Sequence, residues 1–366
     1  MPSLTESYHL DAAPAGLERL VDRIEDNPGR LIRPGELDTL AEHVDVRAVL
    51  ANLPSGMSEG DFAGAVRLAL LTECATESYA RVFEDASARY GAPWLGRFIH
   101  NVWTPDELTH HAPFKLLLMQ AGFLEGELDA AVRETQDRPY LHESGLTPAH
   151  LTAFGMVQEY LTDNWHGLIA GLLRQHAREA AIMVSRIKQR ETLHTTWYRD
   201  MTALQLEANP RLLTHVGEAI ANFKMPGNSL VPELQDQAPI WMERMGADFD
   251  RILRDLVRLV ATAAGDARST GRLLLQIAAA RGERVGPFSA RHLALALGRL
   301  GGPAHGLIGE ALLERLGLGY LFPQPGASRR ADERIVRRLR ALLRGWIRDR
   351  IELELGPPPR PALSEA

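Results

Sequence analysis

The sequence predicts an all-α fold, a four-helix bundle with additional helices at both ends of the chain. Apolar residues recur with a helical period almost throughout, and Val, Ile and Thr do not gather into the alternating runs typical of strands. Proline and glycine interrupt this pattern between stretches long enough for bundle helices. With 366 residues, 45% of them hydrophobic, the chain can bury a substantial core, so we expect one large bundle with appendages.

The N-terminal segment, residues 1–58, is expected to hold short helices, because proline and glycine turn signals divide it. The bundle itself is expected over residues 59–230. Its four helices are predicted at about 59–90, 104–121, 147–173 and 175–207. Thr104-Pro105 and Thr147-Pro148 predict two of the helix starts, since threonine caps a helix and proline is favoured in its first turn.

Two C-terminal segments follow the bundle. Residues 231–322 are expected to form helices packed on the bundle, at about 240–264, 267–281, 288–300 and 303–316. Residues 323–366 are predicted to form a basic amphipathic helix, between Arg329 and Arg350, and a proline-rich tail. This helix is interpreted either as a docking surface for an acidic partner or as the solvated face of a packed helix, and a membrane-surface role ranks third.

Composition and charge argue against several classes of protein. The net charge of −6 and the pI near 6.1 argue against general nucleic-acid binding, which requires an excess of basic charge. The single cysteine, Cys74, excludes an internal disulfide framework and is expected to be a small buried hydrophobe. Without a run of about 18 apolar residues or a signal peptide, we expect a soluble, cytoplasmic protein without stable membrane insertion.

A Glu-x-x-His pattern occurs twice in the predicted bundle, as Glu107 with His110 and as Glu191 with His194. Residues i and i+3 of a helix share a face, so the glutamate and histidine of each copy can reach the same metal ion or a neighbouring pair of ions. The pattern therefore predicts two helices that present metal ligands to the bundle interior.

A lone glutamate on the preceding helix accompanies each copy, Glu73 before the first and Glu159 before the second. Together with the two Glu-x-x-His helices they supply the four carboxylates and two imidazoles of a ferritin-like, carboxylate-bridged two-metal centre. Four carboxylates also balance the charge of two divalent cations, which makes their burial together acceptable. The sequence therefore predicts a ferritin-like four-helix bundle as the core.

Other interpretations of these residues stay open at this point. The composition also produces Glu-x-x-His by chance, so the spacing alone does not decide, and a third copy, Glu6 with His9, is set aside because it has no partner glutamate. Glu77, one turn along the same helix face, is an alternative to Glu73. His111 is expected in an outer or surface position, and His166 as a hydrogen-bonded core histidine. The tryptophans and tyrosine near the ligands are interpreted as bundle packing: Trp103, Trp165, Trp197 and Tyr198.

The residues around the ligands resemble the soluble acyl-acyl-carrier-protein desaturases, the plant stearoyl type and its actinobacterial relatives. The resemblance covers roughly residues 60–230, and several separate motifs agree with the family pattern. These are Thr72-Glu73 with Tyr79, Trp103-Thr104 followed by Glu107 and His110, Gln158-Glu159 with Thr162 and His166-Gly167, and Tyr198 and Pro210 after the second Glu-x-x-His. The tyrosyl-radical subunit of ribonucleotide reductase shares the ligand pattern, but the flanking residues resemble the desaturases better.

The resemblance implies a di-iron enzyme. Glu73 with His110 would hold one of two Fe ions, and Glu159 with His194 would hold the other. The two remaining glutamates, Glu107 and Glu191, would bridge the two ions. Thr162 would lie beside the dioxygen site and help to manage protons. The implied reaction introduces a cis double bond into a long acyl chain carried on acyl carrier protein, with electrons from a reductant such as ferredoxin, in a homodimer.

The chain departs from the family pattern at the residues that support the ligands. Relatives place an acidic residue before the glutamate of both Glu-x-x-His copies, whereas this chain has Asp106 before the first and Arg190 before the second. Arginine accepts no hydrogen bond, and no tryptophan precedes Trp94 to take the place of the N-terminal tryptophan of the plant proteins. Two alternatives to a desaturase therefore stand, a related di-iron hydroxylase or oxygenase and a non-redox bundle that holds iron or docks on the carrier.

Overall fold

The computed structural model describes residues 15–28, 31–138, 146–265, 269–270 and 273. These residues form helices and their connections, with no strand among them, so the all-α prediction is confirmed. Within the same ranges, no helix has both the length and the apolar character needed to cross a membrane. The Glu6 and His9 pair, the helices predicted at 288–300 and 303–316, and the basic helix between Arg329 and Arg350 lie outside the described residues.

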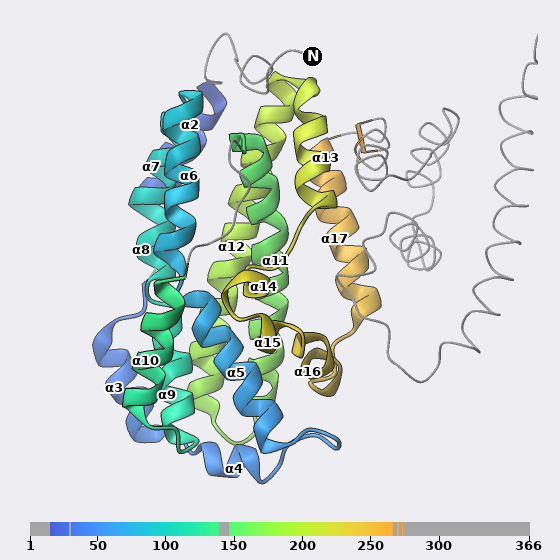
Figure 1. Ribbon diagram of the computed structural model, residues 1–366. Helices are drawn as coiled ribbons and strands as arrows, with labels where there is room; N and C mark the ends of the chain where they lie inside the picture. Colours follow the sequence, from blue (N-terminus) through green and yellow to red (C-terminus); the bar gives the residue numbers. More distant parts are fainter. Residues whose placement is uncertain (1–14, 29–30, 139–145, 266–268, 271–272, 274–366) are drawn as a thin grey trace, which may run out of the picture.

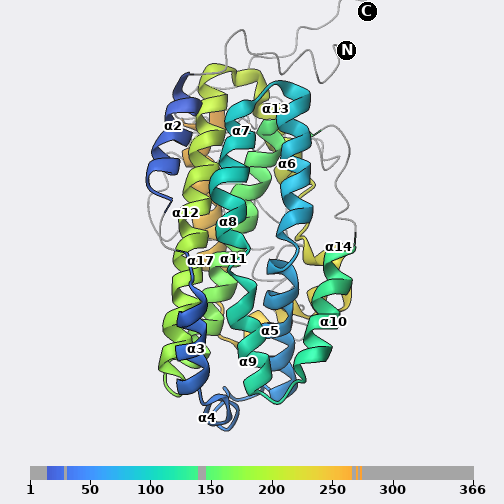
Figure 2. The same ribbon diagram turned by 90° about the vertical axis from the view of Figure 1, so that its left-hand side faces the viewer.

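The long helices α11 (Pro148–Leu173) and α12 (Arg178–Ala208) lie side by side and are antiparallel, because only a short connection joins them (Figures 1 and 2). The start predicted at Thr147-Pro148 is confirmed, since the Thr147 side chain accepts the N–H of His150. The two helices approach closely at Gly155, where an added Cβ would lie 2.9 Å from the Tyr198 ring. This pair forms one continuous half of the bundle.

The helix expected over residues 59–90 is divided into α5 (Glu59–Glu73) and α6 (Thr76–Tyr90), which follow one another along the bundle (Figure 2). The division lies at Cys74, whose carbonyl accepts a hydrogen bond at 3.2 Å from the side chain of Gln136 at the end of α10 (Glu125–Gln136). A carbonyl freed from the helix ladder is thus satisfied by a neighbouring helix. As a result, Glu73 is the last residue of α5.

The next bundle helix begins earlier than predicted, and the expected start at Thr104-Pro105 is wrong. The chain is helical from α7 (Pro93–Phe98) through the π-turn η1 (Ile99–Trp103) into α8 (Thr104–Glu107). In η1 the Thr104 N–H donates to the Ile99 carbonyl, which is the wide π spacing. A proline inside a helix has no N–H to donate and needs such an adjustment of the preceding turn.

The same helix tightens again after the π-turn. The His110 N–H donates to the Glu107 carbonyl at 3.0 Å, a spacing of three residues, before α9 (His111–Gln120) continues. A wide turn before Glu107 and a tight turn after it together set the direction in which the first Glu-x-x-His copy faces.

Shorter helices cover this core. They are α2 (Ala15–Asp26), α3 (Pro34–His43), α4 (Val46–Leu50), η2 (Pro210–Leu212), α13 (Leu213–Ala221), α14 (Gly227–Leu230), α15 (Pro232–Gln235), α16 (Ala238–Arg244) and α17 (Phe249–Ala264). Arg97 of α7 forms ion pairs with Glu18 at 3.0 Å and Asp22 at 2.7 Å and so attaches α2. On the opposite side, the Tyr160 hydroxyl of α11 donates to the Ile252 carbonyl of α17 at 2.8 Å.

A buried histidine pair joins the start of α11 to α13. The rings of His150 and His215 stack with centroids 4.7 Å apart, and both contact the Thr147 hydroxyl, at 2.8 and 3.0 Å. Burial lowers the pKa of each histidine to about 4, so both are neutral in the folded protein near pH 7.

This pair predicts a loss of stability in mild acid. Between the folded pKa of about 4 and the unfolded value near 6.5 the unfolded chain binds more protons, so the free energy of unfolding falls as pH drops through this window. The loss should reach up to roughly 3 kcal/mol per histidine. Urea unfolding from pH 7 to pH 5 should therefore show a shallower pH dependence in the double variant His150→Gln, His215→Gln; an equal slope would contradict the assignment.

Candidate metal centre

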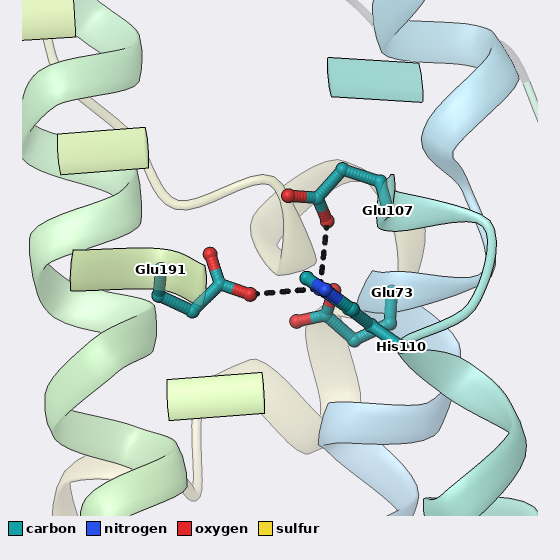
Figure 3. A group of neighbouring side chains, drawn as sticks. All are labelled: Glu73, Glu107, His110 and Glu191. Atoms are coloured by element: carbon teal, nitrogen blue, oxygen red, sulfur yellow. Dashed lines mark ion pairs between the residues drawn. The ribbon is translucent and has the colours of Figure 1, made fainter. Parts of the chain in front are cut away.

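Six buried side chains, contributed by the four long helical segments of the bundle, meet in its centre, and none is more than 6% exposed. They form two groups, and within each group the ligand atoms lie within 4.8 Å of one another. One group is Glu73, Glu107, His110 and Glu191, whose side chains point toward one another in Figure 3. The other group is Glu107, Glu159, Glu191 and His194. Two carboxylates, of Glu107 and Glu191, belong to both groups, so the site could hold a metal ion at either position.

Both histidines face the carboxylates with the same ring nitrogen. Nδ1 of His110 lies 2.9 Å from Glu191 Oε1 and 3.3 Å from Glu107 Oε2 (Figure 3). Nδ1 of His194 lies 2.7 Å from Glu107 Oε1. A neutral imidazole binds a metal through one nitrogen and donates a hydrogen bond from the other. The arrangement therefore directs Nδ1 of each ring to the metal positions and Nε2 away from them.

The outer nitrogens of both rings face one aspartate. Asp106 Oδ2 lies 2.9 Å from Nε2 of His194, and Asp106 Oδ1 lies 3.5 Å from Nε2 of His110. Arg190 donates to the same Asp106 Oδ2 atom from Nε at 2.6 Å. Arg190 in the place of an acid thus leaves neither histidine without a carboxylate, because Asp106 contacts both.

The carboxylates of the centre shift one another's pKa values. Burial and the neighbouring charge of Glu191 raise the pKa of Glu107, and burial with the charges of Glu107 and Glu191 holds the pKa of Glu159 well above its usual range. Burial alone would raise the pKa of Glu191 too, but its hydrogen bonds with the histidines hold that pKa well below its ordinary value.

The buried carboxylates also shift the pKa values of the two imidazoles. Burial would lower the pKa of His110 and His194, but the carboxylates around them, Glu107 foremost, raise both pKa values well above their ordinary value. Protonated imidazoles offset part of the carboxylate charge, and a divalent cation bound at these atoms would displace their protons.

Two further partners of the carboxylates are contacts that the sequence did not predict. The indole N–H of Trp103 donates to Glu159 Oε1 at 3.1 Å, although Trp103 was interpreted as packing only. His166 is fully buried, as a core histidine should be, yet its Nε2 atom lies 3.2 Å from Glu73 Oε1. Their spacing was a usable signal, because Trp103 precedes Glu107 by about one helical turn and His166 follows Glu159 by about two.

The other residues considered as ligands, Glu77, Cys74 and His111, lie outside both ligand groups. Glu77 is exposed on α6 and pairs with Arg81, so Glu73 is the glutamate that joins the cluster. Cys74 is buried, and this burial together with the neighbouring charge of Glu73 raises the pKa of its thiol to about 12. His111 belongs to neither ligand group.

A small cavity reaches the carboxylates. Its lining includes Glu73, Glu107 and Glu159 together with the Thr162 hydroxyl-bearing side chain, and its volume of about 30 Å³ suffices for a molecule the size of water. Thr162 donates its hydroxyl proton to the Gln158 carbonyl at 3.1 Å. The candidate catalytic threonine therefore lies on the same cavity as three of the predicted ligands.

We expect Glu107→Ala and Glu191→Ala each to abolish binding of a metal pair, because each removes a carboxylate that both groups share. The fold should stay helical, since the substitution also removes a buried acid from a crowded set. Metal content after anaerobic loading with Fe(II) or Mn(II), with circular dichroism, measures both effects. Glu77→Ala is the matched control and should bind like the unaltered protein; two metals retained in either shared-carboxylate variant would contradict the assignment.

Comparison of the sequence with models of known protein families finds no match, and comparison with curated proteins finds no significant match. The resemblance to desaturases therefore rests on the motif residues themselves. The geometry adds an all-α bundle with buried groups of glutamate and histidine that could hold a metal ion.

Proposed function

We propose that this protein is a di-iron, dioxygen-dependent oxidoreductase that introduces a double bond into an acyl chain carried on acyl carrier protein. The observation that carries the proposal is the pair of ligand groups that share Glu107 and Glu191 deep in the bundle. Two overlapping groups with two common carboxylates fit a bridged pair of ions better than a single ion. The desaturase motifs around these ligands supply the substrate class.

The donor set favours iron or manganese. Glu73 with His110 would hold one ion, Glu159 with His194 the other, and each ion would gain one imidazole and hard carboxylate oxygens. A bound, reduced iron pair would supply the activation of dioxygen that removal of hydrogen from an unactivated methylene requires. The electrons would come from an external reductant of the ferredoxin class.

The chain's own side chains would orient the ligands and handle protons. His166 contacts Glu73 and Trp103 contacts Glu159, so each of the two carboxylates outside the shared pair has a buried partner that can fix its orientation. Thr162 lines the cavity and donates its hydroxyl proton to the Gln158 carbonyl, so its oxygen can accept a hydrogen bond from a molecule in the cavity.

The cavity is too small for the proposed acyl substrate. A volume of about 30 Å³ admits a molecule such as dioxygen but not a long acyl chain. Met225 and Pro226, in the connection between α13 and α14, form part of this wall. The proposal therefore requires this connection to move when the carrier-bound chain enters.

The same cavity volume favours a second candidate, a bundle that holds iron without acyl chemistry. Iron content and oxygen uptake separate the two. Aerobic incubation with iron, a reducing system and a panel of acyl carrier proteins, followed by mass analysis, should show loss of two hydrogen atoms from one acyl chain. Gain of one oxygen atom would indicate the related hydroxylase, and bound iron without acyl-dependent oxygen uptake would indicate the iron-holding protein.

Thr162→Ala should lower turnover on the order of 10²-fold while iron content stays at about two per chain, because it removes a proton-handling group but no ligand. Thr162→Ser should retain most of the activity. Thr262→Ala on α17 is the matched control, since the exposed Thr262 makes the same bond to the carbonyl four residues before it. Unchanged turnover in Thr162→Ala would exclude a role for this hydroxyl.

A further inference from the structure

Asp106 faces both candidate ligand histidines, and each of its two oxygens lies near the Nε2 atom of one of them. Its Oδ2 atom receives hydrogen bonds from Arg190 and contacts His194. Its Oδ1 atom and the facing Nε2 of His110 are both buried without another hydrogen-bond partner, and they lie 3.5 Å apart. Because buried polar atoms are costly when unpaired, these two atoms are each other's natural partners after a shift of a few tenths of an ångström.

Arg190 is itself held from several sides. It is 8% exposed and Asp106 is 1% exposed, so the ion pair is buried. A second guanidinium nitrogen, Nη2, contacts both Asp106 and the Pro28 carbonyl, in the connection between α2 and α3. The guanidinium carbon also lies 5.5 Å from the centre of the Trp197 ring. Arg190 therefore ties Asp106 to α12 and to the N-terminal part of the chain.

We propose that Asp106 and Arg190 form a single outer support for both metal positions, in which Asp106 orients the two imidazoles and Arg190 is the positioning residue that holds Asp106. The inference rests on the metal centre of the proposed function and not on its acyl substrate. A shared support means that the two positions weaken together rather than one at a time.

The guanidinium also changes the charge around the centre. One carboxylate with one guanidinium is neutral as a pair, whereas a separate carboxylate for each histidine would add two negative charges. A more positive surrounding favours the lower charge state of bound metal ions. Arg190 should therefore raise the reduction potential of a bound iron pair.

Cobalt(II) titration followed by calorimetry and absorption tests the shared support. Asp106→Asn keeps the shape but removes the carboxylate charge that faces both imidazoles, so the affinity of both positions should fall by about 10- to 100-fold. Arg186→Met is the matched control, because Arg186 lies on the same helix and pairs with Glu36 of α3. Weakening of one position alone, or of neither, would overturn this inference only; an unaltered protein that binds no cobalt, iron or manganese would overturn the proposed function as well.

Substitution of the arginine tests its positioning role. Arg190→Met should weaken both positions and lower the midpoint potential of the iron pair, and Arg190→Lys should restore most of both, because it keeps the cation. Equal potentials in the Met and Lys variants, or unchanged metal affinity in Arg190→Met, would contradict the role.

Discussion

Four glutamates are buried together in the core of one helical bundle. Each carboxylate loses hydration there, and several lie close enough to repel one another, so the arrangement demands compensating positive charge. Imidazoles inside the cluster and a guanidinium just outside it supply part of that charge. A metal ion bound among these atoms could supply more of that charge, and the two overlapping groups of glutamate and histidine could hold one.

The two halves of the bundle meet this constraint differently. In α11 and α12 long regular helices carry Glu159, Glu191 and His194 on their inner faces. In the other half the backbone is irregular beside every ligand: α5 ends at Glu73, a π-turn precedes Glu107, and a tight turn follows it. Irregular turns of this kind are common at functional sites, because they direct side chains where a regular helix would not.

The residues that cluster as candidate ligands could be predicted from the sequence because helical spacing is a local property. A glutamate and a histidine three residues apart share a face wherever the helix lies, and the flanking motifs indicated which glutamates accompany them. The helix break at Cys74 could not be predicted from local spacing. The Cys74 carbonyl, which has no partner within the helix, accepts a hydrogen bond from Gln136, far away in the sequence. The start expected at Thr104-Pro105 failed for a related reason, since a proline that often begins a helix can also lie within one after a π-turn. The shared contact of Asp106 with both histidines was equally hidden, because it depends on how α8 and α12 pack.

Anomalous diffraction from crystals loaded anaerobically with iron would locate the metal ions themselves. We expect two iron peaks per chain, both within bonding distance of Glu107 and Glu191, one beside His110 and the other beside His194. A single peak, or iron bound away from these two carboxylates, would contradict the proposed metal pair.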